Sequence, residues 1–90
     1  MYMYFVYMII NTYGDLYIGI TENPQKRLEY HNQHRGALYT KRDTIFQIVF
    51  LEEYTDLASA RKREVQIKKW RREKKEMLIE RHRHGLATNL

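Results

Sequence analysis

The chain has 90 residues and carries sixteen Lys and Arg residues against eleven Asp and Glu, a formal net charge of +5. This length allows a single domain and excludes an enzyme built from separate cofactor and substrate domains. Because cysteine is absent, disulfides, thiolate metal ligands and a cysteine nucleophile are also excluded. The apolar stretch 1–10 is shorter than the roughly 20 residues that span a bilayer and lacks the basic start of a signal peptide. We therefore expect a soluble, cytoplasmic protein without membrane association.

The positive charge is concentrated in the last third of the chain. Residues 61–90 hold eleven basic and four acidic side chains, a net charge of +7, whereas residues 1–60 have a net charge of −2. A basic segment of this kind favours a polyanionic partner, most simply nucleic acid. The same side chains also suit the solvated face of a helix, so the charge alone leaves both interpretations open.

The first twenty residues predict a β-hairpin. Segment 2–10 is rich in Tyr, Phe, Val and Ile without polar alternation, which is typical of a strand covered on both faces. Residues 11–15 are predicted to form the turn, with Gly14 available for a positive φ, and residues 16–20 the returning strand.

The length of this turn fixes the expected register of the hairpin. With a loop of five residues, Ile10 lies opposite Leu16. Tyr7 and Tyr17 then project from the same face of the sheet and are diagonally related.

A helix is predicted directly after the hairpin. Asn23 is a good N-cap and Pro24 suits the first helical position, and the helix is expected to end near Arg35, before Gly36. A third strand over residues 45–51 and two helices over residues 55–70 and 72–83 are predicted to follow. The expected fold is therefore an α+β domain, a small three-stranded antiparallel sheet flanked by helices. We assign residues 1–83 to this single domain and residues 84–90 to a short C-terminal tail.

The second helix carries a carboxylate where an apolar side chain is expected. Leu57, Ala60, Glu64 and Ile67 recur at the spacing of one helix face, and Glu64 interrupts that otherwise apolar face. A charged group in such a place is costly unless it is paired, bound to a metal or at the rim of a cleft. An ion pair with a neighbouring Arg at the edge of the face is the simplest alternative.

Several short motifs stand in a fixed order along the chain. They are Val6-Tyr7-Met8, Tyr17-Ile18-Gly19, Thr21, Arg27, His31, Ala37-Leu38-Tyr39-Thr40, Ala60-Arg61-Lys62-Arg63-Glu64 and Ile67-Lys68-Lys69-Trp70. This ordered set covers roughly residues 2–80 and resembles the GIY-YIG nuclease superfamily, most closely its small bacterial members that consist of this domain alone. The first motif keeps only its Tyr. Asn89, the only late Asn, lies beyond the stretch that resembles the family, and we give it no role.

The resemblance implies metal-dependent hydrolysis of a nucleic-acid phosphodiester. It implies Glu64 as a ligand of one Mg²⁺ or Mn²⁺ ion, with water and phosphate oxygens completing the coordination. Arg27 would hold the phosphate and oppose the charge that builds on it. Tyr7 and Tyr17 would position the attacking water, with the role of each left open. His31, one turn from Arg27, would accept or relay the proton of that water.

A second group of residues is predicted to contact nucleic acid. Gly19 permits a close backbone approach, although a simple β-bulge explains it equally well. The other candidates are the loop residues Thr40, Lys41 and Arg42 and the helix residues Arg61, Lys68 and Lys69. The loop residues suit a phosphate backbone and a solvated surface equally well.

The leading functional hypothesis is a divalent-metal-dependent DNA endonuclease. A domain this small has little surface for reading sequence, so we expect cutting directed by DNA structure or by a partner protein. One alternative is a nucleic-acid-binding module, for DNA or RNA, with weak or no catalysis on the same fold. Another is an interaction domain whose basic helices bind an acidic protein. The sequence leaves the oligomeric state open.

Overall fold

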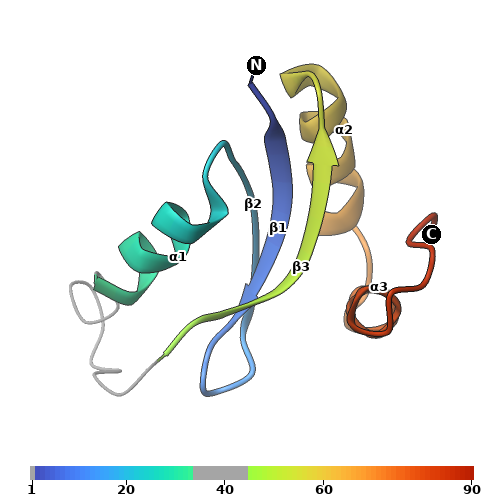
Figure 1. The fold of residues 1–90 in the computed structure, drawn as a ribbon. Coiled ribbons are helices and arrows are strands. Elements are labelled where there is room, and N and C mark those ends of the chain that lie inside the picture. Colours follow the sequence, from blue (N-terminus) through green and yellow to red (C-terminus); the bar gives the residue numbers. More distant parts are fainter. Residues whose placement is uncertain (1, 34–44) are drawn as a thin grey trace.

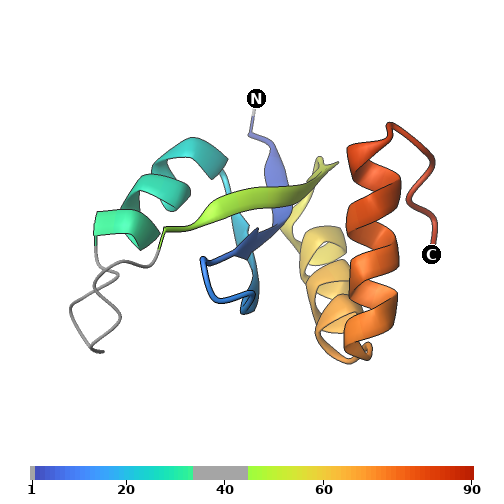
Figure 2. The same ribbon diagram turned by 90° about the horizontal axis from the view of Figure 1, so that it is seen from below.

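The computed structural model describes residues 2–33 and 45–90. In these two stretches the chain forms, in order, β1 (Tyr4–Ile10), β2 (Leu16–Thr21), α1 (Pro24–Gln33), β3 (Gln47–Tyr54), α2 (Leu57–Lys68) and α3 (Arg72–Arg83). The strands form one antiparallel sheet in the order β2-β1-β3. Helix α1 lies on one side of this sheet, and α2 and α3 lie on the other (Figures 1 and 2). The predicted α+β architecture is therefore confirmed.

The hairpin has the register that the turn length predicts. Ile10 pairs with Leu16, and Tyr7 pairs with Gly19. The central strand β1 is buried from Val6 to Ile9, as expected for a strand covered on both faces. In the turn, Gly14 has a φ of +86°, a conformation that favours glycine over residues with a side chain.

Strand β3 lies further along the chain than predicted. It begins at Gln47 and ends at Tyr54, whereas the apolar run predicts a strand over residues 45–51. The difference arises because β3 pairs with β1 as far as Tyr4 opposite Tyr54. The strand therefore continues through Glu52 and Glu53, two polar residues that the apolar pattern does not include.

The helix starts agree with the sequence signals. The Asn23 side chain accepts a hydrogen bond from the backbone N–H of Lys26 at 3.0 Å, and the Asp56 side chain accepts one from Ser59 at 2.7 Å. Both are N-cap interactions that satisfy an otherwise unpaired helix donor. The expected end of the first helix near Arg35 falls outside the described residues.

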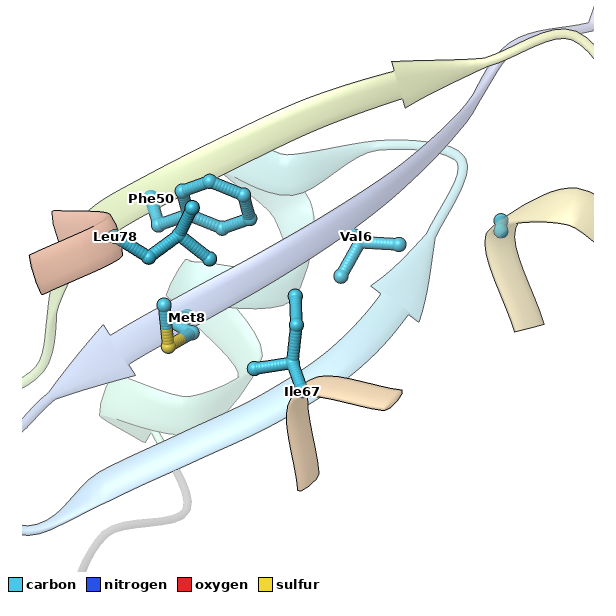
Figure 3. Close-up of a cluster of buried hydrophobic side chains, with 6 residues drawn as sticks. Val6, Met8, Phe50, Ile67 and Leu78 are labelled. Carbon is cyan, nitrogen blue, oxygen red and sulfur yellow. The ribbon is translucent and has the colours of Figure 1, made fainter. Parts of the chain in front are cut away.

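The main core lies between the sheet and helices α2 and α3. Val6 and Met8 of β1 and Phe50 of β3 meet Ile67 of α2 and Leu78 of α3 (Figure 3). The face of α2 that carries Ala60, Glu64 and Ile67 is buried, as predicted. Leu57, the first residue of α2, belongs to the same series but lines a cleft and is 44% exposed.

A polar network joins α2 to β3 and to the end of the chain. The guanidinium of Arg63 donates to Glu52 at 2.8 Å, to the Thr88 carbonyl at 2.7 Å and to the Leu90 carbonyl at 3.0 Å. Glu52 also accepts hydrogen bonds from the hydroxyls of Tyr54 and Thr88. These contacts bring the segment after α3 back against α2, and they lower the pKa of the Glu52 carboxyl despite its burial.

None of the described helices is long and apolar enough to cross a membrane.

Candidate active site

A cleft of about 770 Å³ lies where the end of β2 meets the start of α1 and the first half of α2. Three predicted site residues line it, namely Arg27, Glu64 and Arg61. The other lining residues are Tyr4, Ile20, Thr21, Glu22, Asn23, Lys26, Tyr30 and Leu57. The cleft thus combines cations, a single nearly buried carboxylate and two aromatic rings.

Glu64 enters this cleft from the buried face of α2. Its side chain is only 9% exposed, because it lies on the same face as Ala60 and Ile67, which pack on the sheet. Its two carboxylate oxygens face two cations of its own helix, Arg61 at 3.7 Å and Lys68 at 3.2 Å. The ion-paired alternative considered from the sequence is therefore present, and it coexists with a position at the cleft.

The Tyr7 side chain crosses the strand next to it. It extends over Gly19 of β2, where an added Cβ would lie 2.6 Å from the Tyr7 hydroxyl oxygen. Glycine at position 19 is thus required for the path of this ring. The close approach predicted at Gly19 is made by Tyr7, and contact of Gly19 with nucleic acid stays a prediction.

The Tyr7 hydroxyl is hydrogen-bonded to Nε2 of His31 on α1, at 3.3 Å. Burial raises the pKa of Tyr7, and the negative charge of Glu64 raises it as well, whereas the positive charge of Arg27 lowers it. Tyr7 itself is not among the residues that line the cleft. Its hydrogen bond joins it to His31, one turn of α1 beyond Arg27, which does line it.

His31 is enclosed by aromatic rings. Its ring centroid lies 6.2 Å from that of Tyr7 and 5.5 Å from that of Phe46. The adjacent Asn32 side chain accepts a hydrogen bond from the Phe46 N–H at 2.7 Å and donates one to the Phe46 carbonyl at 3.3 Å. Asn32 therefore fastens the end of α1 to the residue that precedes β3. Burial and the charge of Arg27 both lower the pKa of His31, which favours the neutral imidazole.

These charges predict how His31 titrates. We expect NMR titration of its imidazole protons to give a pKa below the usual value of 6.5. Arg27→Gln should raise that pKa, because one of its two causes is removed, whereas the charge-matched change Arg83→Gln at the end of α3 should leave it unchanged. A His31 pKa that is the same in wild type and Arg27→Gln would show that the guanidinium does not act on the ring.

The lowered pKa of His31 also makes the stability of the fold depend on pH. Because folding lowers the pKa of His31, the unfolded chain binds more protons than the folded chain just below pH 6.5. The free energy of unfolding should therefore decrease as the pH falls through this window.

Tyr17 has a different position from the other predicted catalytic residues. Its register places it on the same face of the sheet as Tyr7, but its ring packs against Phe46 with a centroid distance of 5.6 Å. It is 46% exposed. Like Tyr7 and His31, it is not among the residues that line the cleft, but it has no contact with His31 comparable to the hydrogen bond of Tyr7. Phe46 thus lies between Tyr17 and His31.

The predicted nucleic-acid contacts are distributed over several places. Arg61 and Lys68 flank Glu64 on α2, and Lys69 is the exposed C-cap of that helix. Thr40, Lys41 and Arg42 lie outside the described residues. The basic side chains of α3 contribute much of the charge of the last thirty residues, but α3 packs against β3 and none of its residues lines the cleft.

Sequence reasoning missed four residues around the site. They are Lys26, Tyr30, Asn32 and Phe46. Lys26 and Tyr30 line the cleft. Tyr30 lies three positions after Arg27 on one helix face, a signal that the sequence contains, whereas no spacing rule marks Lys26. No local signal identifies Asn32 or Phe46, because their contact joins residues 14 positions apart.

Comparison with known proteins identifies the family of this chain. A family model for the GIY-YIG catalytic domain matches residues 3–77. The chain belongs to the GIY-YIG family. This membership places it in the GIY-YIG nuclease superfamily, whose members act on nucleic acid and generally use divalent metals.

Relatives of this GIY-YIG domain are small proteins as well. UPF0213 proteins of Staphylococcus aureus strains Mu3, Mu50 and N315 are 40% identical to it over 76 residues, which is 84% of this chain and 93% of theirs. The solution NMR structure of a UPF0213 protein from Bacillus halodurans is similar to this fold, with a TM-score of 0.57 and 28% identity. That match covers 87% of this chain and 83% of the other.

The GIY-YIG site fits a divalent ion that is held mainly by water and substrate. In the described part of the chain, no three His, Asp or Glu side chains lie close enough to share a metal ion. Glu64 therefore offers one hard oxygen ligand beside a cleft that leaves room for water and phosphate. One carboxylate is compatible with a hard divalent ion, since such an ion can keep several waters and take only one or two carboxylates.

Proposed function

We propose that this protein is an endonuclease that hydrolyses DNA phosphodiester bonds with Mg²⁺ or Mn²⁺, in the cytoplasm, on DNA selected by its structure or by a partner protein. The observation that carries the proposal is the position of Glu64, nearly buried at a cleft that it shares with Arg27. The hydrogen-bonded pair of Tyr7 and His31 lies one turn of α1 beyond Arg27. A carboxylate that only stabilises the fold does not require an open cleft, nor a second cation in that cleft that could bind a phosphate.

In this proposal, Arg27 binds the phosphate. It lines the cleft, and its guanidinium donates in a planar fork that matches two phosphate oxygens. Glu64 holds the metal ion, which supplies charge neutralisation at the phosphate and a lower pKa for bound water. Arg61 and Lys68, which flank Glu64, together with Lys69, contact phosphates along the bound strand.

Tyr7 and His31 form the proton-transfer pair in the proposed mechanism. With its pKa raised, Tyr7 carries its proton in the free enzyme at neutral pH. His31, with its pKa lowered, is neutral. When the imidazole proton is on Nδ1, Nε2 can accept the Tyr7 proton. Because both pKa shifts disfavour a separate tyrosinate–imidazolium pair, the Tyr7 oxygen takes a proton from the attacking water in the same step in which it passes its own to Nε2.

The structure favours giving water activation to Tyr7 rather than to Tyr17. Only Tyr7 has a base as its hydrogen-bond partner, whereas Tyr17 packs on Phe46. We therefore propose that Tyr17 orients Phe46 and, through it, the ring of His31.

A cleavage assay tests the proposed function. Single-stranded, nicked, flapped and duplex DNA are incubated with the protein and Mg²⁺, Mn²⁺ or EDTA, and the products are resolved on a gel. We expect metal-dependent cutting of at least one substrate. Arg27→Ala should lower its rate by about a hundredfold, the order expected for loss of one preorganised group that stabilises the transition state.

The matched control is Arg83→Ala, which removes the same group from the exposed end of α3. It should retain wild-type activity. Salt-sensitive DNA or RNA binding without cutting would contradict the enzyme proposal and favour a nucleic-acid-binding module. Absence of nucleic-acid binding would favour an interaction domain for an acidic protein.

A further inference from the structure

The carboxylate of Glu64 is held between two cations of its own helix. A guanidinium nitrogen of Arg61 lies 3.7 Å from one carboxylate oxygen, and Nζ of Lys68 lies 3.2 Å from the other. Arg61 is one turn before Glu64 and Lys68 one turn after it. The carboxylate is nearly buried, whereas the side chains of Arg61 and Lys68 are 61% and 52% exposed. A buried anion is thus neutralised by two long side chains that remain largely in solvent.

These ion pairs differ from the structural one beside them. At the preceding position of α2, Arg63 donates to Glu52 at 2.8 Å, with both side chains mostly buried. Two hydroxyls and two backbone carbonyls fix that pair in place, from Tyr54, Thr88 and Leu90. The cations of Glu64 remain largely in solvent, so they can move to other anions without large changes in their own hydration, whereas the nearly buried carboxylate then requires another cation in their place.

We propose that Arg61 and Lys68 are exchangeable counterions of Glu64. In the free protein they neutralise the carboxylate, and on binding nucleic acid they transfer to phosphates and leave Glu64 to the divalent ion. This inference rests on the proposed function, because it takes Glu64 as the metal ligand.

Electrostatics gives the reason for such coupling. A carboxylate with two adjacent monovalent cations already has a local charge of +1, and a divalent ion added there meets net repulsion. Phosphates that draw the two cations away remove this repulsion. Metal and nucleic acid must therefore raise each other's affinity by the same factor, since coupling of two binding equilibria is reciprocal.

Mn²⁺ binding to the protein without nucleic acid tests the proposal directly, by the loss of the EPR signal of free Mn²⁺. The proteins compared are wild type, Arg61→Gln/Lys68→Gln and Lys62→Gln/Lys69→Gln. Both double variants lose two positive charges from α2 and its C-cap. In the control, however, Lys62 does not line the cleft of Glu64 but a second cleft, beside Glu52. We expect the Arg61/Lys68 variant to bind Mn²⁺ at least about tenfold more tightly than the Lys62/Lys69 variant, because only the former loses cations adjacent to Glu64.

Glu64→Gln separates this inference from the proposed metal site. Equal Mn²⁺ affinity of the two double variants would overturn the counterion proposal, and loss of binding in Glu64→Gln would in that case leave the metal site standing. Unchanged Mn²⁺ binding in Glu64→Gln would overturn both the counterion proposal and the metal site. Absence of Mn²⁺ binding by the Arg61/Lys68 variant would overturn both as well. The single variants Arg61→Gln and Lys68→Gln should give intermediate affinities. Circular dichroism checks that each variant is folded.

Discussion

Replacement of Glu64 by glutamine is expected to lower the rate of DNA cleavage by about 10²–10³-fold, which is the loss typical when a major source of transition-state charge stabilisation is removed. The amide keeps the size of the side chain at this nearly buried position but supplies a weaker, neutral ligand to the metal ion. The measurement is single-turnover cleavage at saturating protein over a range of Mg²⁺ and Mn²⁺ concentrations.

Two observations separate loss of metal binding from loss of fold. The free energy of unfolding should change by less than about 1 kcal/mol, since the ionic partners of Glu64 are mostly exposed. Glu76→Gln, which neutralises an exposed carboxylate of α3, should cleave like wild type. Equal cleavage by Glu64→Gln and wild type would refute the metal assignment.

Gly19→Ala is expected to be nearly as damaging, although it adds a single methyl group. That methyl would lie 2.6 Å from the Tyr7 hydroxyl oxygen and 2.7 Å from the ring carbon that bears it, so the ring must shift and its hydrogen bond to His31 is disturbed. Cleavage should fall by about a hundredfold, the order of one general acid–base contribution. The fold should lose about 1–3 kcal/mol, as is usual when a packed site is overfilled. Chemical denaturation and the same cleavage assay measure the two effects.

Gly14→Ala provides the control for a loss of stability alone. Gly14 has a φ of +86° with open space around it, so alanine there strains the hairpin turn without reaching the cleft. This variant should be destabilised and still cleave DNA. In a Tyr7→Ala background, Gly19→Ala should cost almost no further stability, because the clashing ring is gone. A Gly19→Ala protein with wild-type activity would mean that the position of Tyr7 is not important for the reaction.

Local sequence signals predict the hairpin with its register, because a five-residue turn and a two-residue side-chain period leave few alternatives. The N-caps at Asn23 and Asp56 are also local, because each side chain bonds to a backbone N–H only three residues away. The apolar run places strand β3 too early because the extent of this strand depends on its partner β1, and the pairing carries it through two glutamates.

The candidate site is predictable only in part. The spacing of Glu64 within an apolar face marks it as unusual from the sequence alone, and the fold places it at a cleft with Arg27. Tyr7 and Tyr17 are equivalent in the sequence, since both lie on one face of one hairpin. The fold distinguishes them, because α1 brings His31 into hydrogen-bond contact with Tyr7, whereas the ring of Tyr17 packs against Phe46.

The sequence alone determined the fold class of this protein, its family resemblance and the residue types available for chemistry. These depend on composition, periodicity and the order of motifs along the chain, all of which can be read without knowing which distant residues are in contact. Tertiary structure decided which of those residues meet. The path of the Tyr7 ring over Gly19, the anchoring of Phe46 by Asn32 and the meeting of Glu64 with Arg27 at one cleft each join segments that are separate in sequence. Such contacts are fixed by the packing of helices on the two faces of the sheet, and no local pattern encodes them.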